Sequence, residues 1–275
     1  MAATITAADV NKLRQQTGAG MMDCRKALVE SDGDFEQAVD YLRKKGQKVA
    51  ALRSDRETKE GVIIAKTAAD GKSGVIVALG CETDFVAKNE DFIKFAQSLV
   101  DLALTSGANT VEELGAATLD GATVNDKVND QVAKIGEKIT LARFEKISAA
   151  SVTAYIHGNY RMGVLVGFSE AVAEEVGKDV AMQIAAMNPI AVDAAGVSED
   201  LIAREKAIAL EQIAAEGKTG DMAEKIAMGK VNKFFKDNTL LQQAFVKDNN
   251  KSVGDYLKSV NAGLKVTGFS RIALG

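Results

Sequence analysis

The amino-acid sequence predicts an α+β fold made of an N-terminal three-helix bundle, two related α/β core halves with antiparallel sheets, and a projecting antiparallel helical hairpin. Three observations predict this architecture. Helical periodicity interrupted by glycines fills the first 46 residues, β-branched runs alternate with amphipathic helices from residue 61 onward, and a late segment contains two narrow apolar stripes. We expect these parts to span residues 1–52, 56–145 and 146–275, with the hairpin inserted at 198–236.

Size and composition are those of an ordinary globular protein. The chain has 275 residues, of which 47% are hydrophobic and 26% charged, and its formal net charge is −4. This balance argues against a globally basic nucleic-acid binder. A single histidine excludes a site built from several histidines, and two cysteines 57 positions apart form no metal or disulfide framework. Without an apolar leader or a membrane-length run, we expect a cytoplasmic protein with reduced thiols and no membrane association.

Three short helices account for residues 1–46. Thr6 with Asp9 forms a capping pair for the first helix, which the Gly18-Ala19-Gly20 segment ends because glycine adopts backbone angles that other residues avoid. Met21 and Met22 open the second helix. Asp34 caps the third, whose apolar residues follow helical spacing.

The charge-dense segment 43–60 is expected to be a linker with some helix. Its basic run leaves contact with RNA open, although the interspersed acidic residues favour a solvated linker. The segment therefore separates the bundle from the part of the chain that contains strands.

A β-hairpin opens the core. Two β-branched runs, 61–68 and 74–80, bracket a glycine-rich turn, and the loop CETDFVAK follows them. Asn89 then caps a helix expected to reach residue 104, with Glu90 and Asp91 favourably placed in its first turn. A polar helix is expected at 125–138.

The same succession of elements recurs in the second half. Strands are expected at 139–147 and 151–158, and the run GVLVGF at 163–168 resembles GVIVAL at 74–79, 89 residues earlier. A helix again follows, at 179–187. Two antiparallel helices within 198–236, joined at Gly217-Lys218-Thr219-Gly220, then project from the body, and the chain closes with a helix and a strand.

Residues that could support catalysis are few. His157 follows a strand but has no partner identifiable from spacing, so a hydrogen-bonding histidine is the preferred interpretation. Cys81 and Cys24 occupy apolar patterns, where a free cysteine usually serves as a small buried side chain. The DGKSG segment is a hairpin turn and no phosphate-binding loop is present. We therefore expect no cofactor, no metal site and no enzymatic reaction.

The segment Thr83-Asp84-Phe85-Val86 places an aromatic side chain in a polar loop. Phe85 packs under the following helix in the default interpretation; alternatively it is displayed as an anchor for a partner's pocket, with Asp84 beside it to pair with a cation. Met21 and Met22 allow the same choice, because methionine suits both cores and adaptable binding surfaces.

Several segments together resemble the bacterial elongation factor Ts family. They occur in the family's order and span nearly the whole chain, and TGAGMMDC and TDFVA are the most specific of their motifs. The segments are LRQQTGAGMMDCRKAL (13–28), CETDFVAKN (81–89), YIHGNYRMGVLV (155–166), DVAMQIAA (179–186) and EKIAMGKVNKFFKDNTLLQQAFVKD (224–248).

The resemblance implies a guanine-nucleotide exchange factor that binds elongation factor Tu, in its GDP-bound and nucleotide-free forms, during translation elongation. It implies that Thr83, Asp84, Phe85 and Val86 enter the GTPase near its magnesium and phosphate sites, which reverses the default for Phe85. A UBA-like N-terminal module carrying Met21 and Met22 would also touch the GTPase domain. His157, Phe245 and Val246 would face a distal domain of the partner, and the hairpin would be the family's coiled-coil arm.

This sequence departs from the family pattern at three places. Gln183 stands where many members carry histidine, the loop 157–161 is not in its commonest form, and the chain stops soon after Phe269-Ser270-Arg271, without the longer C-terminal module of some relatives.

Two other functions remain as alternatives. An RNA-binding translation protein would use the basic 43–60 run and Lys225, Lys230, Lys233 and Lys236. A small enzyme would use Cys81 or His157. We expect neither nucleotide nor nucleic acid to bind the protein directly.

Overall fold

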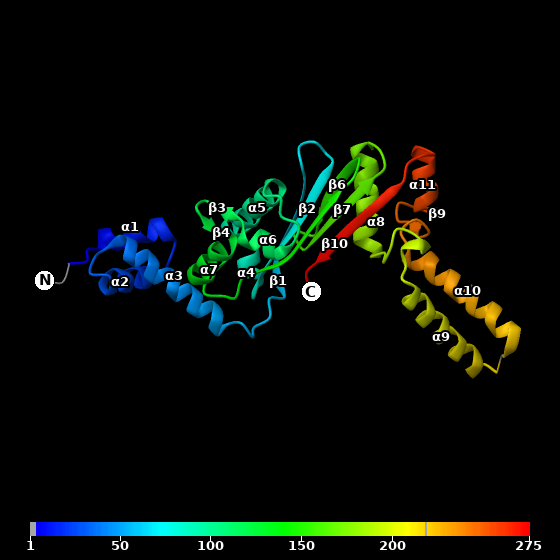
Figure 1. The fold of residues 1–275 in the computed structure, drawn as a ribbon, viewed down its shortest axis with the longest axis horizontal. Coiled ribbons are helices and arrows are strands. Elements are labelled where there is room, and N and C mark those ends of the chain that lie inside the picture. The colour runs from blue at the N-terminus through cyan, green and yellow to red at the C-terminus, as the bar shows by residue number, and fades with distance from the viewer. Residues whose placement is uncertain (1–3, 218) are drawn as a thin grey trace.

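The molecule is elongated, with a helical bundle at one end, a mixed core in the middle and a helical hairpin at the other end (Figure 1). The computed structural model describes residues 4–217 and 219–275. The first three residues of the predicted N-terminal module and Lys218 of the predicted hairpin turn lie outside the described residues.

The N-terminal bundle contains α1 (Ala7–Thr17), α2 (Met21–Glu30) and α3 (Phe35–Leu52). Thr6 and Asp9 form the expected capping box. The side chain of Asp34 accepts the Gln37 N–H at 3.0 Å at the start of α3. A small core that includes Leu13, Cys24 and Leu28 holds the three helices together.

The helix expected within the linker at 43–60 is the end of α3, which continues to Leu52, so the linker is shorter than predicted. The last turns of α3 pack against α7 (Val124–Ile135). The contact is close at Gly46, where an added Cβ would lie 2.8 Å from the Ala133 Cβ. Packing against a distant helix therefore stabilises a segment whose own periodicity is weak.

Two three-stranded antiparallel sheets form the core. The first has the order β1-β2-β5 and the second β10-β7-β6. The runs GVIVAL and GVLVGF lie in β2 and β7, so each is the central strand of its sheet. The strands are β1 (Glu60–Thr67), β2 (Ser73–Cys81), β5 (Thr140–Ser148), β6 (Ser151–His157), β7 (Met162–Phe168) and β10 (Val266–Ala273).

The two sheets pack face to face with helices outside them (Figure 1). Ile63 and Ile76 point to the second sheet and meet Leu165, while alternate residues of the same strands face the helices. This two-sided burial explains why β2 has no polar side chain from Gly74 to Cys81.

Helices cover the outer face of each sheet. The expected helix at 89–104 is α5, capped by Asn89 as predicted. The expected 125–138 helix ends at Ile135, and the expected 179–187 helix begins earlier, at Glu174. The helices are α4 (Asp84–Ala87), α5 (Glu90–Thr105), α6 (Val111–Ala116) and α7 on the first sheet, and α8 (Glu174–Met187) and α11 (Val253–Val260) on the second.

Several short elements are absent from the sequence prediction. They are β3 (Thr118–Leu119), β4 (Ala122–Thr123), η1 (Ala194–Gly196), β8 (Ala244–Phe245) and β9 (Asp248–Ser252). Each has five residues or fewer, too short for a periodic signal.

The predicted hairpin consists of α9 (Glu199–Ala215) and α10 (Gly220–Asn238). The two helices pack on each other through Ala209, Ile213, Ala223 and Ala227 and extend away from the core (Figure 1). Within the described residues, no helix has both the length and the apolar character needed to cross a membrane.

Candidate partner-binding site around Phe85

The Thr83–Val86 segment is a single helical turn that displays Phe85. Thr83 is the N-cap of α4, and the Phe85 side chain is 84% exposed. Val86 and Ala87, in contrast, pack against the core. Packing of Phe85 under α5 is therefore wrong, because the turn directs its two smaller apolar residues inward and the aromatic ring outward.

Glu137, directly after α7, fixes the start of this turn. One carboxylate oxygen of Glu137 accepts the Thr83 N–H at 3.1 Å, and the other accepts the Thr83 hydroxyl at 2.7 Å. The thiol of Cys81 donates to the Thr83 carbonyl oxygen at 3.2 Å. The base of the exposed turn is thus held by groups on both sides of it.

Glu82 ties the same turn to the segment after α3. Its carboxylate accepts hydrogen bonds from Arg53 at 2.9 Å, Arg56 at 2.8 Å and the backbone N–H of Lys138. The Lys138 N–H, then Arg56 and Arg53, lower the pKa of the Glu82 carboxyl from 4.5 to about 2. Glu82 is consequently a stable anion at the junction of three segments.

Asp84 lies on the solvent side of the turn. It pairs with Lys88 at 2.6 Å one turn later, and this hydrogen bond lowers the pKa of Asp84. Both side chains are exposed, so the pair contributes little to stability and can be exchanged for contacts with a partner.

A hollow of about 200 Å³ adjoins the Phe85 ring. Phe85, Val86 and Asn89 line one side, and Lys134 and Ile135 line the other. Sequence reasoning missed Lys134, Ile135 and Glu137, because α7 lies about 50 residues further along the chain and has no motif that links it to the Phe85 turn.

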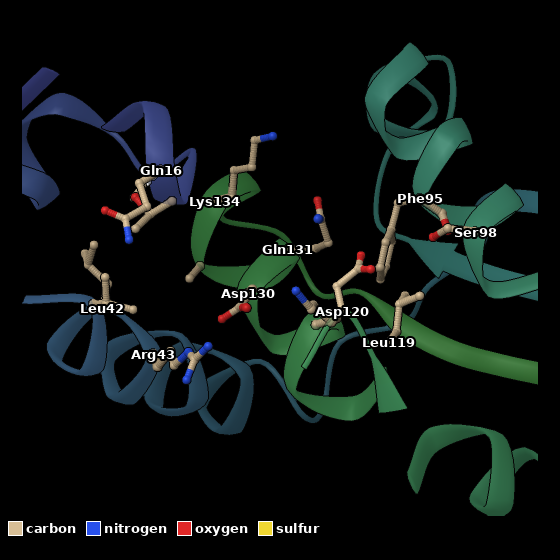
Figure 2. A pocket seen from close by; sticks show the side chains of 15 residues that line it. Gln16, Leu42, Arg43, Phe95, Ser98, Leu119, Asp120, Asp130, Gln131 and Lys134 are labelled. Atoms are coloured by element: carbon tan, nitrogen blue, oxygen red, sulfur yellow. Dashed lines mark hydrogen bonds between the residues drawn. The ribbon is translucent and has the colours of Figure 1, made fainter. Parts of the chain in front are cut away.

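Met21 and Met22 lie in the first turn of α2, on the N-terminal bundle. Their side chains are 41% and 74% exposed. A cleft of about 400 Å³ lies between this bundle and the core, and Figure 2 shows Leu42 and Arg43 of α3 on one side of it and Asp130 of α7 on the other. Lys134 lines both this cleft and the hollow beside Phe85.

His157 ends β6 on the exposed surface. Its Nδ1 lies 2.9 Å from the Tyr155 hydroxyl, and the two rings are 5.9 Å apart. The structure therefore places it as an exposed, hydrogen-bonded histidine.

Phe245 and Val246 have opposite environments. Phe245 is 3% exposed and stacks on Tyr256 with ring centroids 4.3 Å apart, so its side chain belongs to the core rather than to an open surface. Val246 is 39% exposed. Val246 is therefore the exposed member of the pair and Phe245 supports it from within, while contact of this segment with a partner stays a prediction.

Gln183 orders the backbone around Val246. Its carbonyl oxygen accepts the Val246 N–H at 2.8 Å, and its amide donates to the Ala244 carbonyl oxygen at 3.1 Å and to Gln243 at 3.2 Å. The side chain is fully buried. The residue that departs from the family pattern is therefore a structural support for this surface.

The two cysteines are buried thiols. Burial, together with the charge of Glu137, raises the pKa of Cys81 to about 12, and burial raises the pKa of Cys24. Very little thiolate exists at neutral pH in either case, which disfavours a cysteine nucleophile.

Part of the basic segment is engaged inside the protein. Lys45 pairs with Asp23, and Arg53 and Arg56 both pair with Glu82. These cations are thus less available to RNA than the sequence indicates.

The predicted contact residues occupy separate places. Met21 and Met22 lie on the bundle at one end of the long axis, α4 lies in the middle, and Val246 lies next to α8 toward the other end (Figure 1). Thr83, Asp84, Phe85 and Val86 are gathered in α4 and its N-cap, and Met21 and Met22 lie together in the first turn of α2.

Comparison with known proteins identifies the family. The family model described as Elongation factor TS matches residues 82–275. Elongation factor Ts of Flavobacterium psychrophilum is 54% identical, covering 99% of this chain and 100% of that protein. Its counterpart in Christiangramia forsetii is 52% identical with the same coverage, and that of Porphyromonas gingivalis is 45% identical over 98% of both chains. The chain therefore belongs to the elongation factor Ts family.

Proposed function

We propose that this protein binds elongation factor Tu and promotes release of GDP from it during translation elongation. The observation that carries the proposal is the display of Phe85, a large apolar side chain that is 84% exposed on a turn whose base is fixed by hydrogen bonds. Family membership supports a role in translation elongation.

Phe85 acts as the anchor in this proposal. Its ring enters the GTPase near the helices that support the magnesium and phosphate sites, with Asp84 beside it. GDP is held largely through its phosphates and Mg²⁺, so a displaced metal or phosphate loop removes strong electrostatic attraction. No covalent bond is made or broken, and the protein acts as an exchange factor without a cofactor of its own.

The other surfaces contribute affinity. Met21 and Met22 would contact the GTPase domain, while His157 and Val246 would contact a distal domain. Because these surfaces are spread along the molecule, the bound protein would contact its partner at several separated places. Coupling between the two ligands is reciprocal: if this protein weakens GDP binding, GDP weakens binding of this protein by the same factor.

The test is release of fluorescent GDP from the cognate elongation factor Tu in stopped flow. Wild-type protein should accelerate release, and Phe85→Ala should reduce the acceleration by about thirtyfold, because loss of a central anchor costs about 2 kcal/mol. Met222→Ala, which truncates another exposed apolar side chain on the projecting arm, is the matched control and should behave as wild type.

Each outcome has a distinct meaning. No acceleration by folded wild-type protein contradicts the exchange function. If Phe85→Ala accelerates GDP release as fully as wild-type protein, the exchange function stands but Phe85 is not its anchor.

A further inference from the structure

We propose that Glu137 is a positioning residue for nucleotide exchange: its carboxylate fixes the turn that presents Phe85. The proposal rests on the exchange function above and adds a residue 52 positions away from the anchor. Glu137 does not line the hollow beside Phe85, so it would act through the turn rather than by touching the partner.

The α4 turn needs support from outside itself. It comprises only four residues, and an isolated turn of this length is unstable because helix formation requires a costly nucleus. Thr83 supplies the N-cap, and Glu137 holds Thr83 through both of its oxygens, at 3.1 Å to the N–H and 2.7 Å to the hydroxyl. With the hydroxyl proton directed to Glu137, the Thr83 oxygen is oriented to accept the Val86 N–H.

The tie between the two segments is reciprocal. Thr83 donates to Glu137, while the neighbouring Lys138 N–H donates to Glu82. Lys138 also extends its ammonium group to the carbonyl oxygens of Ser54 and Arg56. The consecutive residues Glu137 and Lys138 thus bind the consecutive residues Thr83 and Glu82. Two adjacent ties fix both the position and the direction of the turn.

Positioning matters because the anchor is a single exposed ring. A partner pocket gains most from a ring that is already held in the bound orientation, since otherwise binding has to order the turn as well. Loosening the turn should therefore reduce exchange without altering any atom that touches the partner.

Glu137→Gln is the sharpest substitution. Glutamine keeps the shape but has one acceptor oxygen, and its amide would face a Thr83 donor. Thr83→Val removes the hydroxyl, whereas Thr83→Ser retains it. Glu113→Gln is the matched control: Glu113 accepts the Asn109 N–H at 2.7 Å near the start of α6, in a comparable cap away from the turn.

The experiment measures the maximal rate of fluorescent GDP release from elongation factor Tu for each variant, with and without Phe85→Ala. Glu137→Gln and Thr83→Val should each slow release by about tenfold, the effect of losing a charge-assisted hydrogen bond. Thr83→Ser, which retains the hydroxyl, should release GDP faster than Thr83→Val. Glu113→Gln should stay within about twofold of wild type. In the Phe85→Ala background, Glu137→Gln should have no further effect, since the group it positions has gone.

Three results separate the possible failures. Wild-type rates for Glu137→Gln, or an equal slowing with and without Phe85, overturn the positioning role. If circular dichroism shows that Glu137→Gln does not fold, the rates of GDP release by Thr83→Val and Thr83→Ser are compared instead. Equal rates for these two variants overturn the proposal. A wild-type protein that does not accelerate release contradicts the exchange function itself, whatever the variants do.

Discussion

Phe85 and Phe92 lie close together in the chain but in opposite environments. The Phe85 ring is 84% exposed, whereas Phe92, in the first turn of α5, is 1% exposed in the core. An exposed ring contributes little to folding, so its apolar area remains available for association.

This contrast gives a prediction for stability. Phe92→Ala should lower the free energy of unfolding by about 3–5 kcal/mol because it leaves a cavity, and Phe85→Ala should change it by less than about 0.5 kcal/mol. Urea unfolding followed by circular dichroism measures both. A similar loss for the two variants would show that Phe85 packs within the fold, contrary to this structure.

Glu82 gives a prediction for pH dependence. Its pKa is about 2 when folded against an ordinary value of 4.5, so its stabilisation is complete above about pH 4.5 and is lost as pH falls toward 2. Wild-type protein should therefore exceed Glu82→Gln in stability at neutral pH, and the difference should shrink below about pH 4.5. Unfolding midpoints across this range test it. If the stability difference between wild-type protein and Glu82→Gln stays constant with pH, the destabilisation comes from altered packing rather than from the lost charge.

At the scale of elements, local sequence signals predicted the capped helices and the strands but not the tertiary contacts that these elements make. Asn89 identifies the start of α5 because the cap and the first turn are adjacent in sequence. The direction of α4 depends on Glu137, and the last turns of α3 depend on α7. Neither contact leaves a pattern in the local sequence. For this reason the sequence of α4 resembles a loop, and that of the last turns of α3 resembles a linker.

The candidate site follows the same division. The TDFV segment could be identified from its composition and its family resemblance, but no sequence pattern connects it to Lys134, Ile135 or Glu137. Likewise, only the fold separates buried Phe245 from exposed Val246, since both are apolar and adjacent.

Glycines give a prediction at this scale. A Cβ at Gly163 in β7 would lie 2.8 Å from Ile63 of the facing sheet, so Gly163→Ala should destabilise the protein by about 1–3 kcal/mol. Gly229, inside α10, has open space at the same position, and Gly229→Ala should stabilise the helix by up to about 1 kcal/mol. Thermal unfolding measures both variants. A destabilising Gly229→Ala or a neutral Gly163→Ala would contradict the packing described.

At the scale of the molecule, the repeated strand pattern predicted the equivalent central strands of two sheets. The division at 1–52, 56–145 and 146–275 remains a prediction. The helix α3 belongs to the first of these parts yet packs against α7 of the second, so sequence boundaries and packing do not coincide there.

The elongated shape suits a protein that contacts its partner at several separated surfaces (Figure 1). In the proposed mechanism, these surfaces supply affinity while the Phe85 turn distinguishes the nucleotide-free partner from the GDP-bound one. Exchange then follows from differential binding, because only an interaction stronger in one state shifts the equilibrium between them.

The most direct test of this claim is titration calorimetry of wild-type protein and Phe85→Ala against elongation factor Tu, in its nucleotide-free form and with GDP and Mg²⁺. Wild-type protein should bind the nucleotide-free form more tightly by a factor on the order of 100, and Phe85→Ala should narrow that ratio. Equal affinity of wild-type protein for the two forms would contradict the account.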